Sequence, residues 1–266
     1  MKISFPVVVR IFLIILLIHC FRASYPADET LEAGVNALSL GQVKALGDLS
    51  NPALLSFEVQ KQVGISVFSR FGMKELSTKS LYGIFPNRII DAGFRLSAYG
   101  FEDYQLLSGQ LSLAKKLSSG LSLGVNLGYS NEYSILEEQA NNDYSAGLGI
   151  YWQPGGSFEW AFAAENLLHT TKTVPALYCG GFRYRLTSFF CVLMEANSDF
   201  RNDFHLSAGA EYEIAEQFTV RCGFQNNPQT PSFGLSYNSL HWEIETAFLL
   251  HPVLGLSSAI GVNYYF

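Results

Sequence analysis

Strict alternation of apolar with small or polar residues is the feature that most constrains this chain. From residue 61 to the end, segments of roughly ten residues alternate in this way, and each is followed by a turn. In one of them, Leu121, Leu123 and Val125 share one face, while Ser122 and Gly124 share the other. A period of two residues is the signature of a β-strand. The chain from residue 61 onward is therefore predicted to be all-β.

Fourteen such segments can be counted, and an even number lets both ends of a barrel lie on one side. They cover residues 61–71, 78–85, 88–99, 104–116, 119–130, 143–153, 157–167, 174–186, 189–197, 203–215, 217–226, 231–238, 240–250 and 253–266. Several connections are tight, and the longest is expected at residues 131–142. Short turns at one end and longer loops at the other are typical of a transmembrane barrel, with the short turns in the periplasm.

Composition excludes several other classes of protein. Hydrophobic residues make up 48% of the chain and charged residues only 15%, against roughly 25% charged in average soluble domains. A polytopic helical protein needs several apolar runs of about 20 residues, but the chain has one long apolar run, Ile11–Ile18. The 14% aromatic content excludes a disordered chain. A net charge of −6 argues against a nucleic-acid binder.

A secreted β-sandwich is the competing interpretation, because its strands alternate as well. Soluble sheets protect their edges with lysine, yet Lys172 is the only lysine after Lys116. The chain also ends inside a predicted strand with Tyr264 and Phe266 on one face, which resembles the C-terminal sorting signal of bacterial outer-membrane barrels. Aromatic residues near strand ends suit interfacial girdles: Tyr129, Trp152, Phe158, Trp160, Tyr212, Phe218, Trp242, Phe248 and Tyr264. These features favour a transmembrane antiparallel β-barrel over residues 61–266.

The N-terminal region divides into two parts. Residues 1–24 combine a basic start, the apolar run and the small residues Ala23 and Ser24, which indicates a cleaved signal peptide. A short helical anchor and a lipoprotein site at Cys20 are the alternatives. Residues 25–60 show no clean period, and we expect a compact segment that tucks into or under the barrel.

Charged residues of both signs fall on the inward face by parity. Such groups need partners once they leave bulk water, so a salt-bridge and hydrogen-bond network is predicted to fill the lumen; a solute path lined by the same residues is the alternative. The candidate network consists of Arg95, Arg183, Arg185, Glu211, Arg221, Glu243 and Glu245.

Catalytic and metal sites are not indicated. Glu211 with Glu213, and Glu243 with Glu245, are carboxylate pairs roughly 6.5–7 Å apart at strand rise, a separation also found in glycosidases. Nothing else in the sequence supports catalysis, and the histidines lack metal-ligand spacing. We therefore expect no enzyme, metal or cofactor. The odd number of cysteines after the signal peptide (Cys179, Cys191 and Cys222) argues against disulfides, and all three are interpreted as packed or lumenal thiols.

Residues 33–55 carry a family resemblance. Ala37–Gly41, Gly47-Asp48 and Asn51-Pro52-Ala53 resemble the N-terminal hatch motif of the FadL-like outer-membrane proteins, and the PorV/PorQ branch of the Bacteroidetes is the closer match. Further stretches of that branch's pattern follow at residues 164–167, 209–212 and 251–255, so the resemblance covers almost the whole mature chain. The hatch residues it marks are Gly41, Gly47, Asp48, Asn51, Pro52 and Ala53.

The resemblance implies a fourteen-stranded barrel with an N-terminal plug, in the outer membrane of a Gram-negative bacterium of the Bacteroidetes. FadL-like members pass hydrophobic molecules, and PorV and PorQ act in type IX secretion. The prediction is a noncatalytic platform for type IX secretion or a related surface assembly. Its partners would be outer-membrane lipid, the barrel-assembly machinery and secretion or surface-attachment proteins. The alternatives are a transporter of small hydrophobic molecules, gated by the hatch around Asn51-Pro52-Ala53, and a structural barrel without solute traffic.

Overall fold

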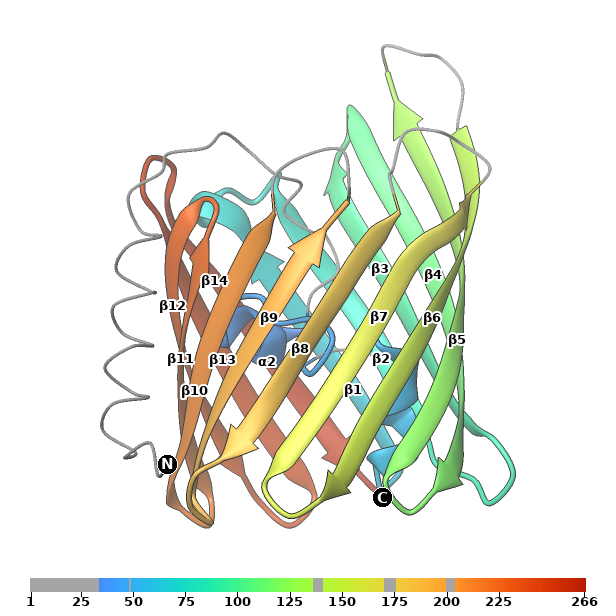
Figure 1. Ribbon diagram of the computed structural model, residues 1–266. Helices are drawn as coiled ribbons and strands as arrows, with labels where there is room; N and C mark the ends of the chain where they lie inside the picture. Colours follow the sequence, from blue (N-terminus) through green and yellow to red (C-terminus); the bar gives the residue numbers. More distant parts are fainter. Residues whose placement is uncertain (1–33, 48, 136–140, 170–175, 200–203) are drawn as a thin grey trace.

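The alternating segments form one closed antiparallel sheet in the computed structural model (Figure 1). The structure describes residues 34–47, 49–135, 141–169, 176–199 and 204–266. Each strand pairs with its neighbours in sequence, and β1 pairs with β14 to close the barrel. The strands are β1 Gln62–Ser69, β2 Ser77–Phe85, β3 Asp91–Phe101, β4 Tyr104–Ser118, β5 Leu121–Ser134, β6 Asn141–Gly155, β7 Phe158–His169, β8 Leu177–Arg185, β9 Phe190–Ser198, β10 His205–Ala215, β11 Phe218–Asn226, β12 Gln229–Asn238, β13 Trp242–His251 and β14 Gly255–Tyr265. The predicted fourteen-stranded antiparallel barrel is confirmed.

The connection predicted to be longest is shorter than expected. β5 continues to Ser134 and β6 begins at Asn141, with Glu132 opposite Asn141 in the ladder. Polar side chains extend the pairing here, since Asn131 Nδ2 donates to Asn142 Oδ1 at 2.8 Å. The apolar alternation stops before this point, so periodicity alone ended β5 too early, at residue 130, and began β6 too late, at residue 143.

The two faces of the sheet differ as the alternation predicts. On β5, Leu123, Val125 and Leu127 are exposed on the outside, whereas Ser122 and Asn126 are buried inside. An apolar outer band with a polar interior is the pattern of a barrel in lipid. Among the described residues, no helix is long and apolar enough to span a membrane.

Aromatic side chains form contacts around the outer face near the end that holds the C-terminus. Trp242 and Tyr264 lie 4.7 Å apart between ring centroids, and Tyr264 stacks on Phe266 at 6.0 Å. Similar contacts join neighbouring strands around this rim: Phe158–Phe182, Phe190–Tyr212 and Phe218–Tyr237. Such a ring matches the aromatic girdle of a membrane barrel.

One of the cysteine interpretations is wrong. Cys179 and Cys191 are buried and free, but Cys222 is free and exposed. Cys222 lies on β11 between Arg221, which is buried in the lumen, and Gly223, which faces the hatch, so parity turns its thiol outward.

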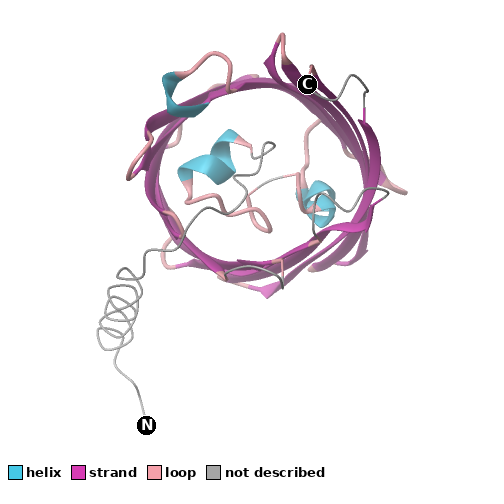
Figure 2. Ribbon diagram, turned by 90° about the horizontal axis from the view of Figure 1, so that it is seen from above, coloured by secondary structure: helices cyan, strands magenta, loops and turns pink. Residues whose placement is uncertain are grey.

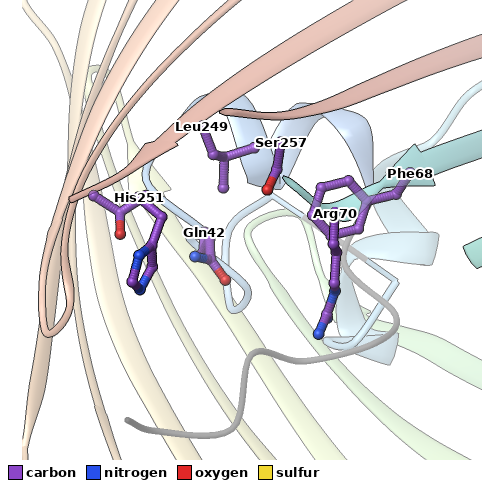
Figure 3. A pocket seen from close by; sticks show the side chains of 7 residues that line it. Gln42, Phe68, Arg70, Leu249, His251 and Ser257 are labelled. Atoms are coloured by element: carbon purple, nitrogen blue, oxygen red, sulfur yellow. The ribbon is translucent and has the colours of Figure 1, made fainter. Parts of the chain in front are cut away.

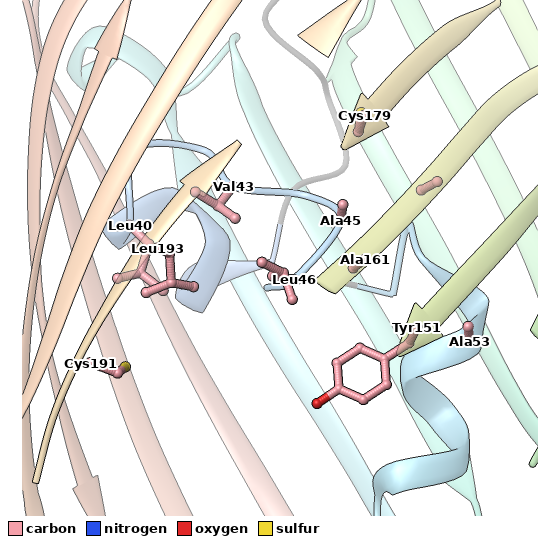
Figure 4. Close-up of a cluster of buried hydrophobic side chains, with 11 residues drawn as sticks. Leu40, Val43, Ala45, Leu46, Ala53, Tyr151, Ala161, Cys179, Cys191 and Leu193 are labelled. Carbon is pink, nitrogen blue, oxygen red and sulfur yellow. The ribbon is translucent and has the colours of Figure 1, made fainter. Parts of the chain in front are cut away.

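The N-terminal segment lies inside the barrel. Seen from above, helix α2 (Val35–Ser39) and the 3-10 helix η1 (Pro52–Phe57) both sit within the ring of strands (Figure 2). Leu40, Val43 and Leu46 pack against small or apolar wall residues such as Ala161 and Leu193 (Figure 4). Residues 34–47 and 49–60, the described part of the segment, are called the hatch below. Within the described part of the chain, the largest cluster of buried apolar side chains therefore lies between the hatch and the wall.

Glycines on the inner wall let the hatch approach the strands closely. A Cβ atom at Gly124 would lie 2.7 Å from the Ala53 nitrogen, and one at Gly209 would lie 2.9 Å from the Leu40 oxygen. At Gly223 a Cβ would overlap the hatch backbone at Leu40 and Gly41. The alternation of glycine with larger residues thus makes space for hatch backbone.

Substituting Gly223 with alanine should displace the hatch, because the backbone atoms of Leu40 and Gly41 occupy the space that the new methyl group needs. Overpacking of this kind costs about 1–3 kcal/mol, to be measured as lost stability in urea unfolding of the protein in detergent micelles. The matched control is Gly180→Ala, where the nearest atom to the new Cβ is Phe162 Cδ2 at 3.6 Å. Equal stabilities for the two variants would contradict the close seating of the hatch.

Candidate functional site

The Asn51-Pro52-Ala53 stretch fixes the start of η1. Asn51 is fully buried, and its Oδ1 accepts a hydrogen bond from the Ala53 nitrogen at 3.1 Å, which caps the helix. Asn51 Nδ2 donates to the Ala45 oxygen at 2.8 Å and to the Ile150 oxygen on β6 at 3.3 Å. One amide therefore joins η1, the preceding loop and the wall.

The other residues of the predicted hatch motif have different positions. Gly41 has φ +78° and is followed by Gln42 at φ +63°, so two successive residues are left-handed at the tip of the turn after α2. A Cβ at Gly47 would lie 2.7 Å from the Val43 oxygen, which indicates a tightly folded loop. Asp48 lies outside the described residues.

A carboxylate on β9 clamps the hatch loop. Glu195 is 2% exposed; its Oε1 accepts from the Lys44 nitrogen at 2.8 Å and its Oε2 from the Ala45 nitrogen at 2.7 Å. The Lys44 ammonium lies 4.0 Å from Glu165 Oε2 on β7. Hydrogen bonds to an ionised acceptor are about twice as strong as neutral ones. The clamp therefore fixes the loop to this side of the wall.

Sequence reasoning did not identify Glu195 or Lys44. A signal for Glu195 existed, because Cys191, Leu193, Glu195 and Asn197 share the inward parity of β9. Lys44 lies in the segment without a period, where no parity argument applies.

Other wall side chains satisfy the carbonyl groups of the hatch. Ser122 Oγ donates to the Ala53 oxygen at 2.7 Å, and Asn126 Nδ2 donates to the Ser50 oxygen at 2.9 Å. Ser232 Oγ donates to the Ser39 oxygen at 3.1 Å and lies 2.9 Å from the Gly41 nitrogen. Buried backbone groups outside regular structure need such partners. Polar wall residues on several strands thus hold the hatch.

The structure brings most of the predicted lumen network into two clusters. In one, Glu159 accepts from Arg183 at 3.1 Å and lies 3.5 Å from Arg185, whose side chain is half exposed. In the other, Arg221 contacts Glu211 at 2.5 Å and Glu245 at 3.5 Å. The register explains the first contact of each cluster, since Glu159 is opposite Arg183 and Glu211 is opposite Arg221.

Two predicted members lie apart from these clusters. Glu243 accepts hydrogen bonds from Asn263 Nδ2 at 3.0 Å and from the Tyr265 hydroxyl. Arg95 is buried on the inner face of β3, on another part of the sheet. The sequence spacing paired Glu211 with Glu213 and Glu243 with Glu245. In the structure, Glu211 and Glu245, one from each pair, both contact Arg221. Among the described residues, no group of three or more His, Cys, Asp or Glu could hold a metal ion.

The hatch and the two ion-pair clusters all lie on the inner side of the barrel wall (Figure 2). A small pocket remains between the hatch tip at Gln42 and β12–β14, with room for about one water molecule (Figure 3).

The fold is shared with known outer-membrane channels. The monoaromatic hydrocarbon channel CymD matches with a TM-score of 0.68 and 13% identity, covering 90% of this chain and 99% of that one. The Pseudomonas putida toluene transporter TodX matches at 0.66 and 12%, covering 92% and 98%. A Pseudomonas aeruginosa FadL homologue matches at 0.65 and 12%, covering 91% and 99%. No family model and no curated protein matches the sequence. At these identities the likeness shows the fold alone, a closed antiparallel barrel of fourteen strands.

Replacing Glu195 with glutamine should loosen the hatch loop, because the charge is lost and one of the two acceptor oxygens becomes an NH₂ donor facing a backbone N–H. Removing a buried charge-assisted acceptor costs about 1.5–3 kcal/mol. Limited proteolysis in detergent should then cut within residues 40–50 faster than in the wild type. Glu213→Gln is the control, since Glu213 shares the inward parity of β10 but is exposed at the strand end. Unchanged cleavage in Glu195→Gln would show that the clamp does not hold the hatch.

Proposed function

We propose that this protein is a noncatalytic outer-membrane transporter of small hydrophobic molecules in a Gram-negative bacterium, with the hatch as its gate. The apolar outer face and the aromatic rim fit a barrel surrounded by lipid. The likeness to CymD, TodX and a FadL homologue supports the same placement. The end with the C-terminus would face the periplasm, and the barrel-assembly machinery would recognise the terminal Phe266.

The observation that carries the proposal is an apolar strip on the inner wall beneath the hatch. Ala161 and Ala163 on β7, Cys179 on β8 and Leu193 on β9 are all buried against hatch residues. Smaller apolar groups meet the hatch at Ala247, Leu249 and Ala259 and at Ile84 and Ala114, and the other buried wall residues are mostly serine, asparagine, glutamate and arginine. Displacing the hatch would uncover this strip, which offers a hydrophobic solute a surface that the charged clusters do not.

The attachment of the hatch is compatible with movement. Its described contacts are hydrogen bonds, one ion pair and van der Waals packing, and its helices are only five and six residues long. Hydrogen bonds to water can replace those to the wall, so each neutral bond contributes a net stability of about 0.5–1.5 kcal/mol, and the charge-assisted bonds to Glu195 contribute about 1.5–3 kcal/mol each. A closed resting state that opens on solute binding follows from this balance.

The docking role in type IX secretion finds no support in the comparisons, which favour the transport alternative. The PorV/PorQ branch, an origin in the Bacteroidetes and secretion partners remain predictions from sequence resemblance. A structural barrel without traffic is the outcome that a failed transport experiment would favour.

A disulfide between the hatch and the wall should abolish transport reversibly. A Cβ placed on Gly209 would lie 3.1 Å from Leu40 Cβ and 2.9 Å from the Leu40 oxygen. A shift of the hatch away from this strand by about 0.5 Å relieves the second contact and brings the two Cβ atoms into the disulfide range of about 3.5–4.5 Å. In a background with Cys179, Cys191 and Cys222 changed to serine, Leu40→Cys with Gly209→Cys should lose uptake of a radiolabelled alkylbenzene on oxidation. Reduction should restore it.

The two single-cysteine chains are the controls, and oxidation should leave their uptake unchanged. If the double variant forms the disulfide and still transports the alkylbenzene, the hatch is not the gate.

A further inference from the structure

The pocket at the hatch tip is lined by polar groups and by two apolar side chains. Figure 3 shows Gln42 from the hatch with His251 and Ser257 from the wall, beside the apolar Phe68 and Leu249. The Arg70 guanidinium also lines the pocket and lies over the Phe68 ring, 5.4 Å from its centroid. Residues from the hatch and from both sides of the β1–β14 closure therefore converge on one small space.

Thr230 on β12 gives the pocket a hydroxyl that the protein does not satisfy. Its side chain lines the pocket and is 3% exposed. Within the part of the chain that the structure describes, Thr230 Oγ1 has no hydrogen-bond partner. Burying a hydroxyl without a partner is unfavourable, so a molecule that enters the pocket gains by bonding to it.

His251 and Ser257 each accept hydrogen bonds from backbone N–H groups, so each keeps a proton to donate. His251 Nδ1 lies 3.2 Å from the Val253 nitrogen and 3.0 Å from the Leu254 nitrogen, so it accepts and the ring proton is assigned to Nε2. Ser257 Oγ accepts from the Phe71 nitrogen at 3.1 Å, which leaves its own proton to donate. The pocket thus combines donors with a hydroxyl that can either donate or accept.

We propose that this pocket is a subsite for one hydroxyl group of the solute, and that the chain carries hydroxylated hydrophobic molecules of the alkylphenol class. This inference rests on the proposed transport function. A hydroxyl can accept from Ser257 or His251 and donate to Thr230 Oγ1, and its size matches the space of about one water for which the pocket has room.

A carboxylate would pair with the Arg70 guanidinium, but its two oxygens need more space than the pocket offers, and it has no proton to give to Gln42 Oε1. Phe68 and Leu249 supply apolar contacts for the adjoining carbon skeleton.

Binding of 4-propylphenol and of propylbenzene to the full-length protein in detergent, by calorimetry, tests the proposal. The two compounds differ by one hydroxyl, and the wild type should bind the phenol about tenfold more tightly, as one well-placed hydrogen bond provides. Thr230→Val preserves the side-chain shape and should reduce that preference to about threefold or less. Ser257→Ala should reduce it as well.

Thr219→Val is the matched control, because Thr219 is also a buried inward-facing threonine but lies at the other end of the barrel, on β11. It should keep the wild-type preference, and comparing variants in the same micelles cancels partitioning into detergent. A wild-type protein that binds both compounds equally, or a Thr230→Val protein that keeps the full preference, overturns the hydroxyl subsite and leaves the transport function standing. If neither compound binds or is taken up, the proposed function fails and the subsite fails with it.

Discussion

The rest of the structure depends on hydrogen bonds between the backbone of the hatch and the side chains of the wall. The hatch contains one five-residue α-helix and one six-residue 3-10 helix, so most of its buried N–H and C=O groups need partners elsewhere. Glu195 on β9 and both Ser122 and Asn126 on β5 provide them. Irregular backbone at membrane depth is tolerated only where protein or water satisfies it. The polar side chains of the inner wall therefore supply the hydrogen bonds that the irregular backbone of the hatch needs.

The same wall also contains the apolar strip that packs against Leu40, Val43 and Leu46. Hydrogen bonds give the hatch its position, and apolar burial gives it affinity for the wall. The Arg221 and Arg183 clusters are less exchangeable, because removing one partner of a buried ion pair leaves an uncompensated charge. Moving the hatch breaks the hydrogen bond from Arg183 Nη2 to the Leu46 oxygen but leaves the Arg183–Glu159 and Arg221–Glu211 pairs intact, so it costs less than separating those pairs.

Much of this fold follows from the sequence because parity is a strong constraint in a two-faced strand. The alternation of Leu123 and Val125 with Ser122 and Gly124 determines which face meets lipid, and the same rule put Arg221 and Glu211 inside. Strand ends were less predictable, since the polar pair Asn131–Asn142 extends a hairpin beyond the apolar pattern.

The candidate site was predicted less completely. The Asn51-Pro52-Ala53 stretch marks the hatch, but its seat depends on contacts between residues far apart in sequence, such as Lys44 with Glu195 and Ser39 with Ser232. No periodicity encodes those distances. The outward thiol of Cys222 follows from strand parity, because Arg221 beside it faces inward. The left-handed backbone at Gln42 could not be predicted, because glutamine rarely adopts a positive φ.

Amide hydrogen exchange of the full-length protein in detergent tests the central claim, that wall side chains hold the hatch inside the barrel. The backbone N–H groups of Lys44 and Ala45, which bond to Glu195, should be strongly protected although they lie in no helix or strand. The Gly41 N–H, bonded to Ser232, should be protected as well. Exchange of these amides at the rate of an unstructured chain, with the strands of the barrel still protected, would contradict the account.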